Sequence, residues 1–486
     1  MGLYRFLMRL VVIVPVVFYS GFAHAQCPPY TVERATSIDV TPDDNLNEVV
    51  QSAAANTTVF LAGGIYQIKS NLQIRTDSIT LRSKTGNRDD VILDGSNGSE
   101  SHNREEFTPE VVAVSGNDVH LVDITVRYAR DHGIHIYPPA DHSIRGCRMH
   151  NIHVYDCGQQ LIKVNSNGNS EQLCWVDSGI LEGSLIEFID NSVMEDKGSY
   201  FYTGGLDVHG GEGWVVRWNN FRNIQRDGKL MEHSVHFWSK SRGTIVENNR
   251  FENVYRGIGF GMKQEADGLV RMYEDGAGEN PYRDHIDGVI RNNVIFNRVG
   301  IHLESGMELW NVFGTEVRHN TVYSADEPFS SIEYRWAQGV TIANNLVSQR
   351  IMARNTVDMC ITAGNIPEAD DDFFVDAVLG DLHLSSNAAE AIDRGTGGNS
   401  IGSEYDHDGR KRDEKPDIGA YEYSSEAVLP FVFQVRERRN GIHKEICCCS
   451  LLGRKITIAD GSFDINSSHQ LLVISGITQK RLLRLK

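Results

Sequence analysis

The chain has 486 residues, a formal net charge of −18, 45 glycines and 12 prolines. The excess of acidic groups argues against nucleic acid or an anionic membrane surface as a partner, because both would repel it. The length allows a large core and more than one domain. The glycine content suits many short strands joined by tight turns better than a helical protein.

Residues 1–25 have the features of an export signal. Arg5 and Arg9 form a basic region, an apolar run covers 10–19, and Ala23-His24-Ala25 is a small-x-small cleavage site. The run is too short to favour a membrane span, so we expect no integral membrane segment after signal removal. We therefore predict a secreted or cell-surface protein, either extracellular or periplasmic.

The eight cysteines do not resemble a dense disulfide framework. Export makes disulfides feasible, and Cys157 and Cys174 could close a loop. Cys447, Cys448 and Cys449 are consecutive and match no metal-ligand spacing. We expect buried thiols or a single structural bridge.

An N-terminal cap is predicted over 26–58. Residues 43–55 suit a short helix, with Asn45 near its cap and Val49 and Val50 on its apolar face. Such a helix could cover the end of a solenoid. Short alternating strands follow it.

A repeat with two strand types is clear from about residue 111. One type has the pattern Val216-x-x-Asn219-x-Phe221, with a looser copy at Asn191. Asparagine tolerates left-handed backbone in a sharp turn, and stacked copies can hydrogen-bond along a ladder. The predicted ladder is Asn219, Asn249, Asn293, Asn320 and Asn345, and the gap of 44 residues before Asn293 marks an insertion.

This pattern resembles the right-handed parallel β-helix proteins of the pectate-lyase-like superfamily, over about residues 59–347. The resemblance implies an all-β fold: a right-handed parallel β-helix solenoid over 59–369, with a short N-terminal helical cap and a small C-terminal β module. That architecture hosts lyases, hydrolases, epimerases and binding proteins, so the resemblance implies the fold rather than the activity.

Two C-terminal segments follow the repeats. Residues 370–423 resemble the module that closes many exported bacterial β-helix proteins, through 381–384, 391–395, Asp408-Gly409 and 417–422. We predict a capping or anchor-associated module there. Residues 424–486 form a small β tail, and 450–455 with the basic end 479–486 are similar to C-terminal sorting domains of the type IX secretion pathway.

The second strand type supplies two polar columns. Seven four-residue segments begin at Ile134, Ile162, Leu206, Val235, Ile258, Ile301 and Ile332, with apolar first and third residues that should line the interior. The second residues are His135, Lys163, Asp207, His236, Gly259, His302 and Glu333. The fourth residues are Tyr137, Asn165, His209, Trp238, Gly261, Glu304 and Arg335. Because adjacent coils lie about 4.8 Å apart, we expect both columns to crowd one exposed face.

The columns offer groups for acid–base chemistry. His209 and His236 are candidates for general base or acid, and Asp207 could orient or charge-balance a neighbour. Lys163 and Arg335 could neutralise a uronate carboxylate or act as a base. The alternative is that the histidines only hydrogen-bond along a ladder and that Lys163 is solvated.

The same face has the character of a sugar-binding surface. Trp238 and Tyr137 could stack on sugar rings, while charged groups could form hydrogen bonds and ion pairs with the hydroxyl and carboxylate groups of the sugar. Gly259 and Gly261 leave a flat gap where a ring could lie against backbone. The insertion 263–285 is long enough to wall a cleft. The remaining substrate-binding candidates are His135, His302, Glu304 and Glu333.

No cofactor is required by the sequence, although Glu304 and Glu333 offer carboxylate oxygens to Ca²⁺. We predict a lyase that cleaves a uronate-containing polysaccharide by β-elimination. One alternative is a C5-epimerase, because Asp207-Val208-His209 is similar to the Asp-Pro-His motif of β-helix alginate epimerases, with Val208 in place of proline. The other is a noncatalytic carbohydrate-binding or adhesin-like protein. In each case the partner is an acidic polysaccharide, and a monomer is expected.

Overall fold

The structure is a computed structural model. It describes residues 27–99, 103–168, 172–226, 229–262, 271–277, 279–280, 283–396 and 403–424, and three strands beyond them. The predicted export signal at 1–25 lies outside the described residues.

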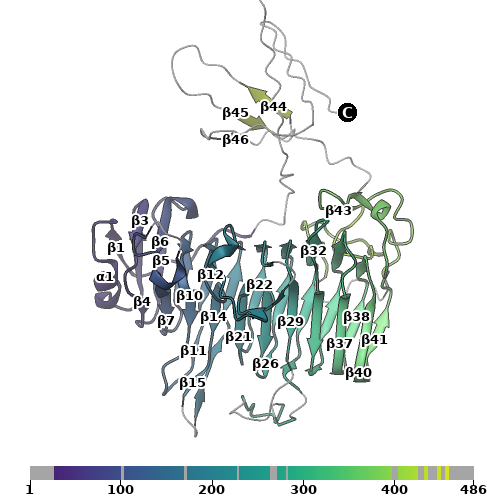
Figure 1. Cartoon of the computed structure of the whole chain (residues 1–486), viewed down its shortest axis with the longest axis horizontal. Helices are drawn as coiled ribbons and strands as arrows, with labels where there is room; N and C mark the ends of the chain where they lie inside the picture. The colour runs from purple at the N-terminus through teal and green to yellow at the C-terminus, as the bar shows by residue number, and fades with distance from the viewer. Residues whose placement is uncertain are drawn as a thin grey trace, which may run out of the picture. The chain divides into compact units, whose positions relative to one another are not determined.

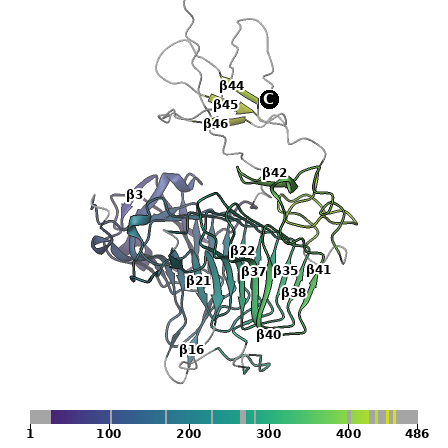
Figure 2. The same cartoon turned by 45° about the vertical axis from the view of Figure 1, so that its right-hand side comes forward.

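The chain winds into a right-handed parallel β-helix, which confirms the predicted fold class. Each full coil adds one strand to each of three parallel sheets, called A, B and C here. Figure 1 shows the coils side by side from the purple N-terminal end to the green end, and Figure 2 shows the same stack turned by 45°.

The sheets are built from short strands, listed in sheet order. Sheet A contains β1 (Thr36–Val40), β2 (Thr57–Leu61), β5 (Ile79–Ser83), β8 (His120–Val122), β12 (Arg148–His150), β18 (Ile180–Glu182), β22 (Val215–Arg217), β27 (Ile245–Glu247), β31 (Val289–Arg291), β35 (Glu316–Arg318), β38 (Thr341–Ala343) and β41 (Ile361–Ala363). Sheet B contains β3 (Gly64–Gln67), β6 (Val91–Asp94), β9 (Thr125–Arg127), β13 (His153–Tyr155), β19 (Leu185–Glu187), β23 (Asn220–Arg222), β28 (Arg250–Glu252), β32 (Val294–Asn297), β36 (Thr321–Ser324) and β39 (Leu346–Val347).

Sheet C carries the predicted polar columns. Its strands are β4 (Leu72–Ile74), β7 (Thr108–Val114), β10 (Ala129–Ile136), β14 (Ile162–Val164), β21 (Leu206–His209), β25 (Val235–Trp238), β29 (Arg256–Phe260), β33 (Ser305–Trp310) and β37 (Ser330–Gln338), with β40 (Ile351–Asp358) beside β37. The far part of β37 also pairs with β34 (Val312–Phe313), which is followed in the sheet by β30 (His285–Ile286) and β26 (Ser241–Arg242).

Shorter elements occupy the turns. The paired strands are β11 (Ile144–Arg145) with β17 (Val176–Asp177), β15 (Asn167–Gly168) with β16 (Leu173–Cys174), and β20 (Tyr200–Phe201) with β24 (Leu230–Met231). The 3-10 turns are η1 (Arg88–Asp90), η2 (Arg104–Glu106), η3 (Asn191–Val193) and η4 (Asp371–Phe373).

The predicted N-terminal helix is present and shorter than expected. Helix α1 (Leu46–Ser52) begins at Asn45, whose side chain accepts a hydrogen bond from the backbone of Glu48. It ends because Ala53 is extended. Leu46 and Val50 are buried in the main core, at the purple end of the solenoid in Figure 1.

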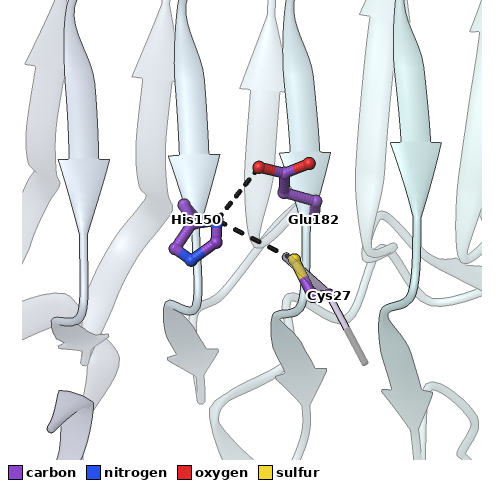
Figure 3. A group of neighbouring side chains, drawn as sticks. All are labelled: Cys27, His150 and Glu182. Carbon is purple, nitrogen blue, oxygen red and sulfur yellow. Dashed lines mark hydrogen bonds and ion pairs between the residues drawn. The ribbon is translucent and has the colours of Figure 1, made fainter. Parts of the chain in front are cut away.

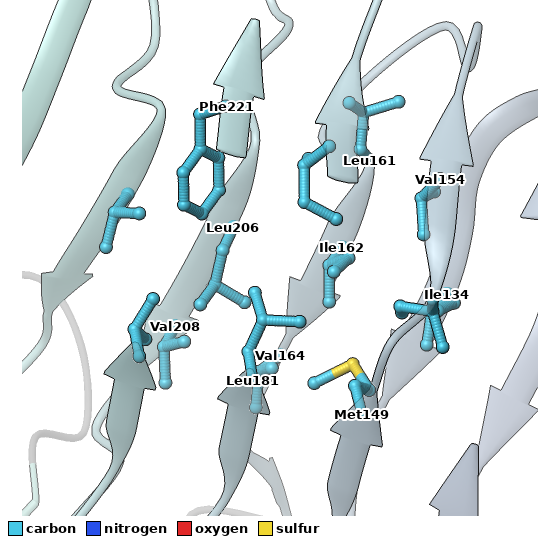
Figure 4. Close-up of a cluster of buried hydrophobic side chains, with 14 of the residues drawn as sticks. Ile134, Met149, Val154, Leu161, Ile162, Val164, Leu181, Leu206, Val208 and Phe221 are labelled. Atoms are coloured by element: carbon cyan, nitrogen blue, oxygen red, sulfur yellow. The ribbon is translucent and has the colours of Figure 1, made fainter. Parts of the chain in front are cut away.

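The core is a continuous stack of aliphatic side chains inside the coils. Ile134, Ile162, Leu206 and Val235 occupy successive strands of sheet C in register, and each is fully buried. Figure 4 shows Ile134, Ile162 and Leu206 together with buried side chains from the other two sheets. Removal of these apolar surfaces from water is the main stabilising contribution to the solenoid.

The predicted asparagine ladder is confirmed and continues one rung further, to Asn365. In each rung the side-chain oxygen of one asparagine accepts from the backbone and side-chain nitrogens of the preceding one, at 2.9–3.0 Å. The rungs lie between sheets A and B. They satisfy polar groups that the coil would otherwise bury unpaired.

Two details of the predicted ladder are wrong. The left-handed residue is the one before each ladder asparagine, namely Trp218, Asn248, Asn292, His319 and Asn344, with φ between 52° and 57°. The looser copy at Asn191 is not a rung, because it lies in η3. Ser184 takes that place, and its backbone nitrogen donates to Asn219 Oδ1 at 2.9 Å.

Residues 370–423 pack on the side of the solenoid. Strands β42 (Phe374–Asp376) and β43 (Asp381–Leu384) contribute to a second core with the outward-facing side chains of β32, β36 and β39. Ala420 N donates to Thr321 Oγ1 at 2.9 Å, and Gly419 N donates to the Asn344 carbonyl at 2.9 Å. These contacts tie the C-terminal module to the outer face of sheet B.

His383 is predicted to make the stability of this module pH-dependent. Its Nδ1 and Nε2 lie 2.6 and 2.8 Å from the carboxylates of Asp381 and Asp408. Burial would lower the pKa of His383, but these two partners raise it to about 9 from 6.5. The stabilisation is therefore complete below pH 6.5, about 3 kcal/mol, and is lost as pH rises through 9.

The measurement is the free energy of unfolding from about pH 6 to 10, by urea denaturation, for the wild type and His383→Gln. We expect the difference between them to shrink as pH rises. A difference that is constant over this range would contradict the assignment.

The C-terminal tail is described only as a three-stranded antiparallel sheet. Its strands are β44 (Val432–Val435), β45 (Ile446–Cys449) and β46 (Lys455–Ile458). The segments 450–454 and 479–486, on which the sorting-domain prediction depends, lie outside the described residues. No helix within the described part of the chain is long and apolar enough to cross a membrane.

The Cys157–Cys174 bridge considered above is absent, and the expectation of buried thiols holds for both residues. Both thiols are free and buried, as is Cys147, and Cys27 and Cys360 are free and half-buried. Cys157 lies inside the solenoid and Cys174 in the short strand β16, so no cross-link joins them.

Candidate functional site

The predicted alignment of sheet C is confirmed for its first five segments. His135 pairs with Lys163, Lys163 with Asp207, Asp207 with His236, and His236 with Gly259. In the second column His209 pairs with Trp238. Side chains from five successive coils therefore line one face.

The sixth segment was placed wrongly. Gly259 pairs with Glu308, and Glu308 pairs with Glu333, so β33 supplies Met307 to Trp310 in place of 301–304. His302 and Glu304 precede this strand and contact Tyr255 instead, through a ring contact of 5.6 Å and an oxygen-to-oxygen distance of 3.5 Å. His302 and Glu304 are therefore not members of the two polar columns, and their predicted role in substrate binding, which depended on that placement, is not supported.

The predicted exposure of the columns is also wrong in part. Lys163, Asp207, His236 and Glu333 are each at most 5% exposed, because neighbouring side chains of the same face pack over them. His209 and Trp238 are half-buried. The solvent-facing part of this region is therefore the fourth-residue column, with His209 at its centre.

Lys163, Asp207, His209 and Trp238 form one hydrogen-bonded group, called the Lys163 cluster. Lys163 Nζ donates to Asp207 Oδ2 and lies 2.8 Å from His209 Nε2. Trp238 Nε1 donates to Asp207 Oδ1 at 2.7 Å, and its ring meets His209 edge-on with centroids 4.3 Å apart. A partly exposed imidazole is thus backed by a buried ion pair.

Electrostatics keep this pair charged. Burial would raise the pKa of Asp207, but Lys163 and His209 hold it well below its usual range. Burial would lower the pKa of Lys163, but the Asp207 carboxylate outweighs it and the pKa is raised. Since a charged lysine only donates, His209 Nε2 accepts the hydrogen bond from Lys163 Nζ, and in the neutral ring the proton is on Nδ1.

A second charged group surrounds Glu308. Arg335 donates to one Glu308 oxygen, while His233 Nε2 lies 3.1 Å and Arg256 Nε 3.8 Å from the other. Burial would raise the pKa of Glu308, but His233, Arg256 and Arg335 hold it below its usual range. Glu308 was not predicted from the sequence, because Leu303-Glu304 and Met307-Glu308 show the same apolar–acidic order and the first pair was assigned to the strand.

Arg335 and Glu333 are already paired with each other. Arg335 Nε lies 3.2 Å from Glu333, which also binds Arg354 at 2.8 Å. The Arg335 guanidinium covers the face of Trp310 at 3.4 Å from the ring centroid. A carboxylate that holds two arginines is a poor calcium ligand, so the pairing of Glu304 and Glu333 around Ca²⁺ is not supported.

His236 is buried among the chain's own groups. Its Nε2 donates to the Gly261 carbonyl at 3.1 Å, and burial, reinforced by His233, lowers its pKa to about 3. The flat gap over Gly259 is filled by His233, whose ring atoms would lie 2.7 Å from a Cβ there. The ring predicted to rest on this backbone therefore belongs to the protein itself.

At the N-terminal side of the face, His135 Nδ1 binds the Glu110 carboxylate and its ring lies 4.8 Å from that of Tyr137. Both side chains are half-buried. His135 is in β10 and Tyr137 directly follows it, two coils from His209. The residues predicted to bind substrate on β10 therefore share one face of sheet C with the Lys163 cluster.

The described part of the 263–285 insertion lies next to the Lys163 cluster. Arg271 donates to the carbonyl of Gly210, the residue after His209, at 2.6 Å, and to Asp177 at 2.9 Å. Tyr273 Oη donates to the Lys240 carbonyl at 2.6 Å. The described part of the insertion therefore borders the end of β21.

Two clusters of metal-ligating side chains occur within the described residues. Cys27, His150 and Glu182 form one, on the outer face of sheet A (Figure 3), with Cys27 Sγ 3.8 Å and Glu182 Oε1 2.9 Å from His150 Nδ1. Arg148 and Arg217 also bind Glu182, which disfavours a cation there. The other cluster is Glu232, His233 and His236.

Comparison with known proteins adds to the description of the fold. No protein-family model matches the sequence, and no curated protein matches it. Among solved structures, the pectate lyase Pel9A is similar with a TM-score of 0.52 and 14% identity, over 81% of this chain and 98% of that chain. An alginate lyase from Paenibacillus sp. str. FPU-7 gives a TM-score of 0.41 and 16% identity, over 69% and 98% of the two chains. The 14% identity to the pectate lyase shows a shared fold alone.

Proposed function

We propose that this chain is an exported polysaccharide lyase that cleaves a uronate-containing polysaccharide by β-elimination. The observation that carries the proposal is the Lys163 cluster, in which a partly exposed histidine is hydrogen-bonded to a buried lysine–aspartate pair beside a tryptophan. The pectate lyase of similar fold supports the substrate class. The export signal predicted at 1–25 supports action outside the cytoplasm, where such polymers occur.

β-Elimination requires a proton to leave C5 of the uronate and the C4–O bond to break. His209 is the group we assign to this proton. When the uronate carboxylate takes over the hydrogen bond from Lys163, the lone pair of His209 Nε2 is released and accepts the C5 proton. The electron pair of the C5–H bond forms the C4=C5 double bond, the C4–O bond breaks, and the leaving oxygen takes the proton from His209. Lys163 stabilises the neighbouring negative charge that develops on the carboxylate.

The structure favours His209 over His236 for this role. The side chain of His209 is 23% exposed, whereas that of His236 is 2% exposed and its Nε2 is bonded to backbone. Arg335 lies four coils from His209, or about 19 Å along the sheet, so it cannot act on the same sugar. Lys163 is therefore the cation we assign to catalysis.

Trp238 and Tyr137 are the aromatic surfaces we assign to sugar binding. Trp238 is anchored by its hydrogen bond to Asp207, so its ring is fixed next to His209. An anchored aromatic ring loses little conformational entropy when a sugar stacks on it. The acidic polymer must still approach a chain of net charge −18, so we expect binding to strengthen with ionic strength at low salt.

The test uses purified protein with alginate, pectate and glycosaminoglycans, and follows the ultraviolet absorbance of the unsaturated uronate product. We expect one polymer to give this signal, and His209→Gln to reduce the rate by about 10²–10⁴-fold. His142→Gln, which changes a surface histidine paired only with Asp141, is the matched control and should keep the wild-type rate.

Two results would reject the lyase. Exchange of the C5 proton with solvent, seen by NMR without chain shortening, would show an epimerase. Polymer binding with neither exchange nor cleavage would show a noncatalytic binding protein.

A further inference from the structure

The second metal-ligating cluster comes from one short stretch, Glu232-His233-Ser234-Val235-His236. We call its three ligating residues, Glu232, His233 and His236, the EHH cluster. A carboxylate oxygen of Glu232 and a ring nitrogen of each histidine lie within 4.8 Å of one another. Glu232 Oε2 is 3.9 Å from His236 Nδ1, and the two imidazole centroids are 4.5 Å apart.

Each histidine of the EHH cluster has one nitrogen fixed as a donor. His233 Nε2 donates to the Glu308 carboxylate at 3.1 Å, and His236 Nε2 donates to the Gly261 carbonyl at 3.1 Å. If each ring is neutral, its proton is on Nε2, and Nδ1 carries a free lone pair that can bind a metal ion. Metal-binding histidines are oriented in this way, with the other nitrogen donating to a carboxylate or a backbone carbonyl.

His233 provides an independent observation. Its side chain is 5% exposed, and within the described part of the chain its Nδ1 is buried with no hydrogen-bond partner. Buried polar atoms normally have partners, so an orphaned nitrogen indicates a group that occupies this position in the working protein. Gly259 holds the His233 ring in place, because a Cβ there would lie 2.7 Å from it.

We propose that Glu232, His233 and His236 bind one first-row divalent transition metal ion, such as Zn²⁺. Two imidazole nitrogens and a carboxylate oxygen are a known ligand set for zinc with an open coordination position. Zinc ligands lie about 2.0–2.2 Å from the metal, so Glu232 Oε2 and His236 Nδ1, which are 3.9 Å apart, would draw together by less than about 1 Å. Imidazole ligands favour such an ion over Ca²⁺, which takes oxygen ligands.

The charges around the EHH cluster are compatible with a divalent cation. Asp207 is the cross-strand neighbour of His236, and Glu308 is hydrogen-bonded to His233. The cations Lys163, Arg256 and Arg335 bind these two carboxylates rather than Glu232. Glu232 is the most exposed member, with 24% of its side chain accessible, and gives an entry path for the ion.

The proposal is independent of the lyase activity, and its test is a binding measurement. Purified protein is treated with a chelator, dialysed, and titrated with Zn²⁺ and with Co²⁺. We expect the wild type to bind one equivalent at this cluster, with a rise in Tm and visible Co²⁺ absorption bands from nitrogen and oxygen ligands.

The variants identify the ligands. Glu232→Gln removes the carboxylate charge, and His233→Gln keeps a donor for Glu308 but removes the Nδ1 ligand. Each should weaken binding by more than about 100-fold, because loss of an outer partner alone weakens it by roughly 10–100-fold. Glu232 is partly exposed, so Glu232→Gln should fold as the wild type does, with circular dichroism as the check.

Cys27→Ser is the matched control, since it disables the other cluster, and should bind as tightly as the wild type. His209→Gln should also bind metal normally, even if no polymer is cleaved. The proposal is overturned if Glu232→Gln binds the same number of equivalents as the wild type, or if Cys27→Ser is the variant that loses one.

Discussion

Lys163→Met is expected to reduce kcat/KM on the cleaved polymer by roughly 10²–10⁴-fold, the contribution of a positioned acid–base group. The Lys163 ammonium holds both Asp207 and His209, so its removal takes the stabilising charge and the hydrogen-bond partner from the catalytic imidazole together. The same change should lower the free energy of unfolding by about 3–5 kcal/mol, because the Asp207 carboxylate is left buried without its cation.

The double variant Lys163→Met/Asp207→Asn separates these two effects. Removing both charges of a buried pair is often nearly neutral for stability, and the amide oxygen that replaces the carboxylate can still accept from Trp238 Nε1. We expect stability close to the wild type with activity still lost. If the double variant regains activity together with stability, Lys163 acts only through the fold and its catalytic assignment is wrong.

Asn293→Ala is expected to lower the free energy of unfolding by about 3–6 kcal/mol. Asn293 occupies a central rung, where its oxygen accepts from two nitrogens of Asn249 and its amide donates to the Val246 carbonyl. Alanine removes the partner of two buried groups, the Asn249 backbone nitrogen and the Val246 carbonyl, at about 1–3 kcal/mol each. Asn249 Nδ2 keeps its hydrogen bond to the Val216 carbonyl and loses only the second one, about 0.5–1.5 kcal/mol. Urea denaturation measures the change.

Two comparisons make this prediction specific. Asn365 is the last described rung, where it accepts from Asn345 and donates to the Ile342 carbonyl. It is only half-buried, so water can replace part of what is removed, and Asn365→Ala should have about half the effect. Asn387 is exposed, and Asn387→Ala should change stability by about 0.5 kcal/mol at most. Equal effects at Asn293 and Asn387 would show that the ladder does not stabilise the solenoid.

Local periodicity was sufficient to predict the fold and most of the strand alignment. The alternation of apolar and polar residues at Leu206–His209 and Val235–Trp238 fixes which side chains enter the core, and a one-residue shift would expose every apolar residue. The repeated asparagine locates the turn once per coil. These signals depend on neighbouring residues, so they can be read without knowing the rest of the structure.

The same periodicity failed where two alignments fit equally well. Leu303 and Met307 are both fully buried, so the sequence alone cannot distinguish 301–304 from 307–310 as the strand. Pairing with Gly259 on one side and Glu333 on the other selects Glu308. The choice therefore depends on contacts between coils that are distant in the chain.

The candidate sites show the same division between sequence and structure. The sequence by itself determined that His209, Trp238, Asp207 and Lys163 share one face, because the coil repeat places them in adjacent columns. Only the tertiary structure decided which of them reach solvent and which pair with one another. It also brought in His233, which precedes the strand and has no place in the alternation. Hydrogen bonds and burial depend on side chains from several coils at once, and these are set only when the coils are stacked.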